Sequence, residues 1–222
     1  TTTTTTGPYK ASVQALEAVN NHAGVIQYYK DELAKDPDSP TVMLNLAQAY
    51  YDYRDIESAN FYVKQLKSHH DHQPGFYFLS GSISADLGKF DLAISEFRKA
   101  KSLGYFDSSL LIKLGIALTN IGRYKEAEAE FNQARLMGHD DIAVKNNLAV
   151  LDLAQGNYLQ AVNLLMPLYQ RNPNDKKVIF NLAISLFKAG DYREAHHLLS
   201  EDYSAEQVAA LFYSLRRDKD SL

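Results

Sequence analysis

The stretch LGIALTNIGRYKEAEAEFNQA, residues 114–134, decides the fold, because the same residue types return at a fixed distance before and after it. Its central alanine, Ala127, belongs to a column of alanines spaced 34 residues apart with no insertion or deletion between them. The column consists of Ala59, Ala93, Ala127, Ala161 and Ala195. A period kept without drift indicates tandem copies of one small structural unit.

Other columns in the same register show what that unit is. Small residues stand twelve positions before each alanine, at Ala47, Gly81, Gly115, Ala149 and Ala183. Bulky apolar residues stand four positions after it, at Val63, Phe97, Phe131, Leu165 and Leu199. Glycine stands five positions before it in every copy but the first, where Arg54 replaces it. Because glycine can end a helix in the left-handed conformation, each copy is predicted to be two helices that cross closely at their small residues.

These columns resemble the tetratricopeptide repeat (TPR) pattern, and the match is carried by Leu114-Gly115-x-x-Leu118, Gly122-x-Tyr124, Ala127, Phe131 and Ala134. The resemblance implies an all-α protein, a right-handed α-solenoid of about six helix pairs with a C-terminal capping helix. We predict a tail or linker over residues 1–9, a degenerate repeat over 10–37, five repeats over 38–203 and the capping helix over 204–217. Ser204 and Gln207 have the spacing of a capping box at the start of that helix.

Composition excludes several classes of function. The formal net charge of -4 gives no positive field to hold a phosphate backbone, so we expect no nucleic-acid partner. The absence of cysteine excludes disulfides, thiol nucleophiles and cysteine-ligated metals. No phosphate loop, nucleophile elbow or metalloprotease motif occurs, so we expect neither an enzyme nor a cofactor. The cluster His69-His70-Asp71-His72 precedes Pro74 in a predicted turn and is interpreted as a solvated loop rather than a metal site.

Function is expected on the concave face, which the first helix of each pair lines in TPR proteins. By analogy, the predicted partner-binding residues are Phe78, Ile112, Ile116, Asn146, Val150, Leu153, Phe180, Ile184 and Phe187. They are mostly apolar, which predicts a groove for an apolar or amphipathic peptide. The alternative is that some of them belong to the core between repeats. TPR domains that clamp a terminal carboxylate would show Lys and Asn here, and only Asn146 fits, so a chaperone-tail clamp is disfavoured.

A closer resemblance covers roughly residues 140–217. Asn146-Asn147-Leu148-Ala149, Gln155-Gly156-Asn157-Tyr158 and Ala189-Gly190-Asp191-Tyr192 are similar to the TadD-type TPR proteins of bacterial tight-adherence (Flp) pilus systems. This resemblance implies a lipoprotein at the periplasmic face of the outer membrane, a pilotin-like factor that binds the C-terminal segment of a pilus secretin. The lipid anchor would then lie upstream of Thr1. The alternatives are a type IV pilus pilotin of the same architecture and a cytoplasmic TPR adaptor or co-chaperone.

Overall fold

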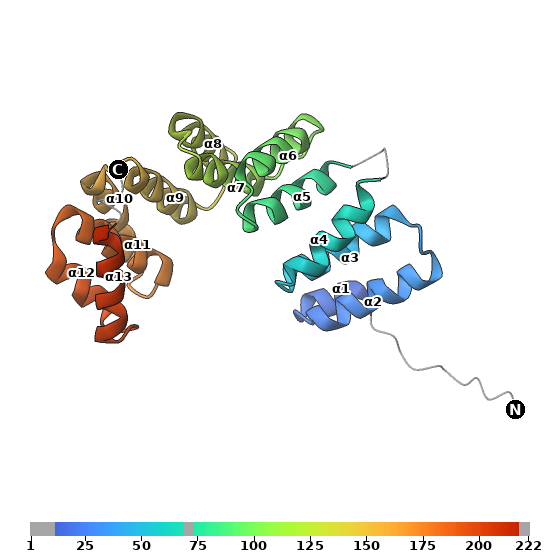
Figure 1. Cartoon of the computed structure of the whole chain (residues 1–222), viewed down its shortest axis with the longest axis horizontal. Helices are drawn as coiled ribbons and strands as arrows, with labels where there is room; N and C mark the ends of the chain where they lie inside the picture. The colour runs from blue at the N-terminus through green and yellow to red at the C-terminus, as the bar shows by residue number, and fades with distance from the viewer. Residues whose placement is uncertain (1–11, 69–72, 218–222) are drawn as a thin grey trace, which may run out of the picture. The chain divides into compact units, whose positions relative to one another are not determined.

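The computed structural model describes residues 12–68 and 73–217, which form thirteen α-helices and no strand (Figure 1). The prediction of an all-α fold is confirmed for this part of the chain. The predicted tail over residues 1–9 and the histidine cluster at His69-His72 lie outside it. The described helices form two compact units that divide between Tyr105 and Phe106: unit 1 before this point and unit 2 after it.

Unit 1 is a stack of helices in which each packs against the next in sequence. Its elements are α1 (Val13–Ala18), α2 (His22–Lys35), α3 (Pro40–Asp52), α4 (Ile56–Leu66), α5 (Pro74–Asp86) and α6 (Phe90–Ser102). The short α1 and the longer α2 occupy the segment predicted as a degenerate repeat. Helix α3 also contacts α5, so the first helices of these two pairs are neighbours.

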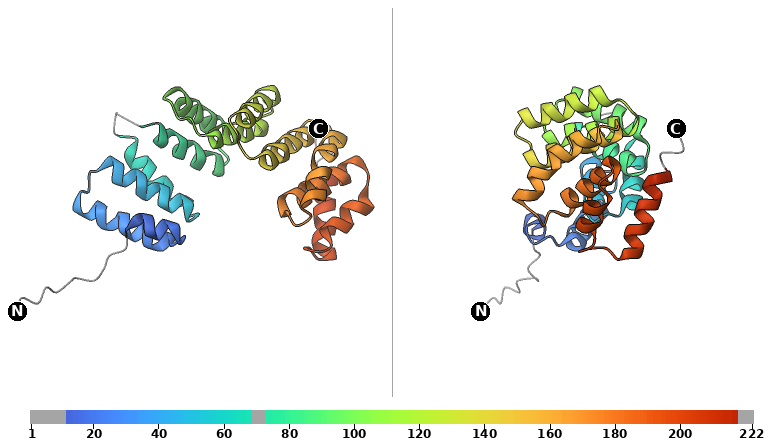
Figure 2. Two further views of the ribbon diagram at one scale, coloured as in Figure 1. Left: turned by 180° about the vertical axis from the view of Figure 1, so that it is seen from behind. Right: turned by 90° about the vertical axis from the view of Figure 1, so that its left-hand side faces the viewer.

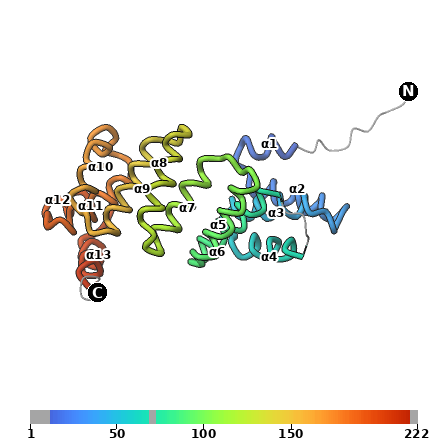
Figure 3. The backbone as a smooth tube through the Cα atoms, turned by 90° about the horizontal axis from the view of Figure 1, so that it is seen from above, coloured from blue at the N-terminus to red at the C-terminus, as the bar shows by residue number. Residues whose placement is uncertain are grey.

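Unit 2 continues the same pattern of paired helices. Its elements are α7 (Ser108–Asn120), α8 (Tyr124–Leu136), α9 (Asp141–Ala154), α10 (Tyr158–Arg171), α11 (Lys176–Ala189), α12 (Tyr192–Leu199) and α13 (Ala205–Arg217). Two further views and the backbone tube let the reader follow the chain from the green α7 to the red α13 (Figures 2 and 3). Helix α9 contacts both α7 and α11, so three first helices lie in a row.

The repeat columns form the core, as the sequence predicts. All five alanines of the central column have no exposed surface, and the bulky residues four positions later are at most 2% exposed. The small column marks the helix crossings, because a Cβ atom added at Gly81 would lie 2.8 Å from the Phe97 ring. One added at Gly115 would lie 2.5 Å from the Phe131 ring. Neither crossing has room for a methyl group.

The turns within the pairs adopt the left-handed conformation that glycine favours. The φ angle is positive at Gly88, Gly122, Gly156 and Gly190. Arg54 occupies the same position in the first full repeat and takes a φ of 68°. This conformation costs a residue with a Cβ atom roughly 1–2 kcal/mol. The Arg54 side chain forms an ion pair with Asp86 on α5, with 3.5 Å between Nη1 and Oδ2.

The C-terminal helix begins with the predicted capping box. The Ser204 amide donates to Gln207 Oε1 at 2.9 Å, and the Gln207 amide donates to Ser204 Oγ at 3.2 Å. These reciprocal bonds satisfy two amides that a helix start leaves unpaired. Val208 of α13 is 1% exposed within the core of unit 2, so α13 covers apolar surface at that end of the stack.

Candidate functional site

The candidate site is a row of side chains on the first helices of unit 2. Eight of the nine predicted partner-binding residues belong to α7, α9 and α11. Spacings of three and four residues place the members from each helix on one face of it. Helix α9 contacts both α7 and α11, so these residues lie on three neighbouring helices. We call the accessible part of this surface the inner-helix face; it consists of Ile116, Asn146, Val150, Leu153, Phe180 and Ile184.

The inner-helix face is apolar and partly exposed. Ile116 is 40% exposed, and the other five residues are half-buried. Asn146 is its polar member, and its Oδ1 accepts a hydrogen bond of 3.0 Å from Asn181 Nδ2. This bond joins α9 to α11, so Asn146 fixes the spacing of two helices that carry the face. A role for Asn146 in contacting a partner stays a prediction.

Two of the predicted residues are core residues. Ile112 is 9% exposed and Phe187 is 4% exposed, so neither offers a side chain to a partner in this structure. Phe187 is covered because its ring stacks on Phe212 of α13, with 4.3 Å between the ring centroids. A second contact joins α11 to α13, because Lys188 Nζ on α11 donates to the carbonyl oxygen of Leu215 on α13 at 2.7 Å. Their assignment as exposed anchors is therefore wrong, and the core alternative applies to both.

Phe78 is separate from the others because it lies on α5 in unit 1. It is half-buried, and its ring stacks on Tyr105 with 4.5 Å between centroids. The structure therefore does not bring Phe78 together with the inner-helix face within one unit.

An apolar pocket extends the face at Phe180, and the sequence analysis did not predict it. The pocket has a volume of about 330 Å³. It is lined by Phe180, Leu199, Tyr203, Gln207, Val208, Ala210 and Leu211. Phe180 comes from α11, Leu199 from α12 and most of the others from α13. The Phe180 and Tyr203 rings lie 6.3 Å apart at one wall. The amphipathic spacing of the last helix was the available signal, but it indicates burial and not an open pocket.

Asp152 is a charged residue of α9 that adjoins members of the inner-helix face in sequence. Asp152 lies between Val150 and Leu153 in sequence, and burial raises the pKa of its carboxyl group, an effect that a hydrogen bond from Asn157 opposes. Asn157 Nδ2 donates to Asp152 Oδ1 at 3.3 Å. No cluster of three or more His, Asp or Glu residues in the described ranges is arranged to hold a metal ion. The partly exposed apolar side chains of the inner-helix face are suited to apolar contact.

Comparison with known families decides the identity of the repeat. Tetratricopeptide repeat models match residues 78–141 and residues 152–217, which together exceed half of the chain. The chain belongs to the tetratricopeptide repeat family. TPR domains bind other proteins, so this chain is a protein–protein interaction module. Comparison with curated protein sequences gives no match.

Solved TPR structures share the fold at low sequence identity. A TPR protein from Parabacteroides merdae superposes with a TM-score of 0.73 at 14% identity, over 93% of this chain and 84% of that one. PilW, a widely conserved type IV pilus biogenesis factor, gives 0.73 at 16% identity, over 90% and 94% of the two chains. YrrB, a TPR protein with an unusual peptide-binding site, gives 0.59 at 18% identity, over 75% and 86%. These likenesses confirm the TPR fold.

Within residues 12–68 and 73–217, no helix has both the length and the apolar character needed to span a membrane.

Proposed function

We propose that this TPR chain is a pilotin-like assembly factor whose inner-helix face binds an amphipathic segment of a pilus secretin. The observation that carries the proposal is the apolar surface of unit 2, which continues into the pocket beside Phe180. An amphipathic helix buries its apolar stripe in such a surface, with side chains three and four residues apart as anchors. The partner segment proposed is the C-terminal tail of the secretin. The protein transforms no substrate in this role.

Support for the pilus context is of two kinds. Residues 140–217 resemble the TadD-type proteins of tight-adherence pilus systems in sequence. PilW, a type IV pilus biogenesis factor, has the same fold over 90% of this chain. That second likeness favours a type IV pilus pilotin as the alternative role. The two roles differ in the secretin that supplies the bound tail, which belongs to the tight-adherence pilus in the proposal and to the type IV pilus in the alternative.

The proposal is tested by the affinity of the secretin tail for variants of the inner-helix face. A fluorescein-labelled tail peptide is titrated with the protein, and binding is read as fluorescence anisotropy. Ile116→Glu places a charge on the exposed α7 part of the face, and Phe180→Ala empties one wall of the apolar pocket. Each is expected to weaken binding at least about tenfold, because each removes an apolar contact of about 1.5–3 kcal/mol.

The matched control is Leu159→Glu. Leu159 is 67% exposed on α10, away from the inner-helix face, so this variant introduces the same charge change outside the site. It should bind the tail with unchanged affinity, and circular dichroism should show equal helicity in all three variants. Equal affinity of wild type, Ile116→Glu and Phe180→Ala for the tail would refute the proposal. Tighter binding of a type IV secretin tail than of a tight-adherence secretin tail would favour the alternative role of a type IV pilus pilotin.

We also propose that the protein acts at the periplasmic face of the outer membrane, held by a lipid on a cysteine upstream of Thr1. The test is the encoded sequence before Thr1, where a signal peptide ending in Leu-x-Gly-Cys is expected. A start codon with no signal peptide would refute this location and would favour the alternative of a cytoplasmic TPR adaptor.

A further inference from the structure

Unit 1 contains a polar cavity that the proposed function does not use. Its volume is about 300 Å³, and its walls come from α1, the α1–α2 turn, α2 and α3. The lining residues are Glu17, Asn20, Asn21, His22, Val25, Tyr29, Asn45, Gln48, Ala49 and Asp52. Most of these carry hydrogen-bonding groups, in contrast to the apolar pocket of unit 2.

The cavity has an excess of negative charge. Glu17 on α1 and Asp52 on α3 each contribute a carboxylate to the lining. No Lys or Arg among the described residues lines the cavity. Gln48 Nε2 donates to Asp52 Oδ1 at 2.8 Å and so orients that carboxylate. Burial and, after it, the charge of Glu17 raise the pKa of the Tyr29 phenol on the same wall.

Local backbone structure fixes the wall that α1 and α2 form. Asn20 takes a φ of 53° in the turn, the left-handed conformation that Asn tolerates better than most residues. Asn21 Oδ1 accepts from the Gly24 amide at 2.9 Å and caps α2. A cavity with a capped turn at its rim needs little ordering when a ligand binds, which favours affinity.

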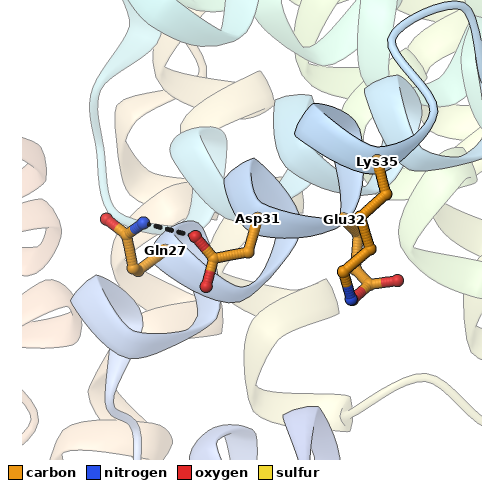
Figure 4. A network of polar contacts seen from close by, with 4 residues as sticks. All are labelled: Gln27, Asp31, Glu32 and Lys35. Carbon is orange, nitrogen blue, oxygen red and sulfur yellow. Dashed lines mark hydrogen bonds and ion pairs between the residues drawn. The ribbon is translucent and has the colours of Figure 1, made fainter.

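The two lysines of α2, Lys30 and Lys35, are not among the lining residues of the cavity. Gln27 Nε2 donates to Asp31 Oδ1 at 2.8 Å, and Lys35 pairs with Glu32 in the last turn of the helix (Figure 4). The lining of the cavity therefore contains no lysine of α2 beside Glu17 and Asp52.

We propose that this cavity binds the basic side chain of a partner peptide, with arginine preferred. The buried Val25 and Ala49, 7% and 6% exposed, provide an apolar floor for the methylene stem. The Glu17 and Asp52 carboxylates and the amide oxygens around them accept from the five N–H donors of the guanidinium group. The site lies in unit 1 and is independent of the inner-helix face, so the two proposals fail separately.

The experiment compares two tripeptides that differ in charge but hardly in shape. Acetyl-Gly-Arg-Gly-amide and its citrulline counterpart are titrated into the isotopically labelled full chain, and amide shifts are followed by NMR. The arginine peptide is expected to shift the amides of Gly24 and Ala49 with a dissociation constant on the order of 1 mM, weaker at high salt. The citrulline peptide should leave these amides in place. Equal shifts from both peptides, or none from the arginine peptide, would overturn the proposal.

Variants locate the binding within the molecule. Glu17→Gln and Asp52→Asn should each weaken binding of the arginine peptide about tenfold, because each removes one carboxylate acceptor. Glu57→Gln is the matched control, since Glu57 is exposed on α4 and does not line the cavity. Equal weakening by Glu57→Gln would show a general charge effect and overturn the site. The wild-type comparison of arginine with citrulline decides the matter even if a cavity variant fails to fold.

Discussion

Gly115 shows how a single position sets the distance between two helices of a repeat. It lies on α7 directly opposite Phe131 of α8, and both residues are buried. A larger residue at 115 would force the Phe131 ring out of its position in the core. The position tolerates glycine because the cost of a flexible residue in a helix is smaller than the cost of a collision in the core.

Gly115→Ala is therefore expected to lower the free energy of unfolding by about 1–3 kcal/mol despite the better helix propensity of alanine. Urea denaturation followed by circular dichroism measures the change. The control is Gly75→Ala on α5, where an added Cβ meets nothing within 4 Å. That variant should be as stable as wild type or slightly more so. Equal effects of the two substitutions would show that the crossing has room for a methyl group.

Glu96 is a second residue with a measurable consequence, because its carboxyl group lies inside unit 1 on α6. Its side chain is 11% exposed, and its nearest cation is Lys67, at 3.8 Å. Burial raises the pKa of the carboxyl group, and Lys67 and Ser80 oppose that shift. The folded state therefore binds the Glu96 proton more tightly than the unfolded state.

It follows that the contribution of Glu96 to stability is present below its ordinary pKa of 4.5 and is lost as pH rises through the raised value. Glu96→Gln should remove this loss, so its stability relative to wild type should increase as pH rises above 4.5. Thermal melts at a series of pH values measure the difference. A difference that stays constant across the series would mean that Glu96 titrates normally.

At the scale of elements, the helices and turns follow from the sequence because each repeat column has one physical cause. Buried alanines, bulky residues opposite them and glycines at the turns return at one period. Arg54 shows that the repeat sets the turn conformation even without glycine, because Arg54 adopts the positive φ that glycines take at this position in the other repeats. The burial of Phe187 beneath α13 could not be predicted from the repeat columns. It depends on α13, which lies outside the period, and no column indicates which residue of α13 lies on Phe187.

The contact between α13 and α11 is tested by Phe212→Ala. Phe212 is half-buried and stacks on Phe187, so its removal should cost about 1–2 kcal/mol and loosen α13. Hydrogen exchange should become faster in α13 and stay unchanged in α7 and α8. The control is the neighbouring Tyr213→Ala, because Tyr213 is 65% exposed. Unchanged exchange in α13 of Phe212→Ala would show that this stack does not hold the helix.

At the scale of the whole molecule, the sequence period passes through residues 105 and 106 without interruption, whereas the contacts separate there into two units. The repeat columns have the same character on both sides of this point and carry no signal for the division. For this reason the predicted partner-binding set combines Phe78 of unit 1 with residues of unit 2. The apolar character of the face was predictable from residue types at helical spacing. The exposure of its members depends on the packing of neighbouring helices and required the structure.

The central claim is that the inner-helix face of unit 2 receives a segment of another protein, and site-specific cross-linking tests it most directly. The chain has no cysteine, so one introduced cysteine carries a benzophenone label at a unique place. The account predicts that label on Ile184→Cys cross-links to the secretin tail on illumination, while label on Leu159→Cys does not. Cross-linking from Leu159→Cys alone, or equal yields from both positions, would contradict it.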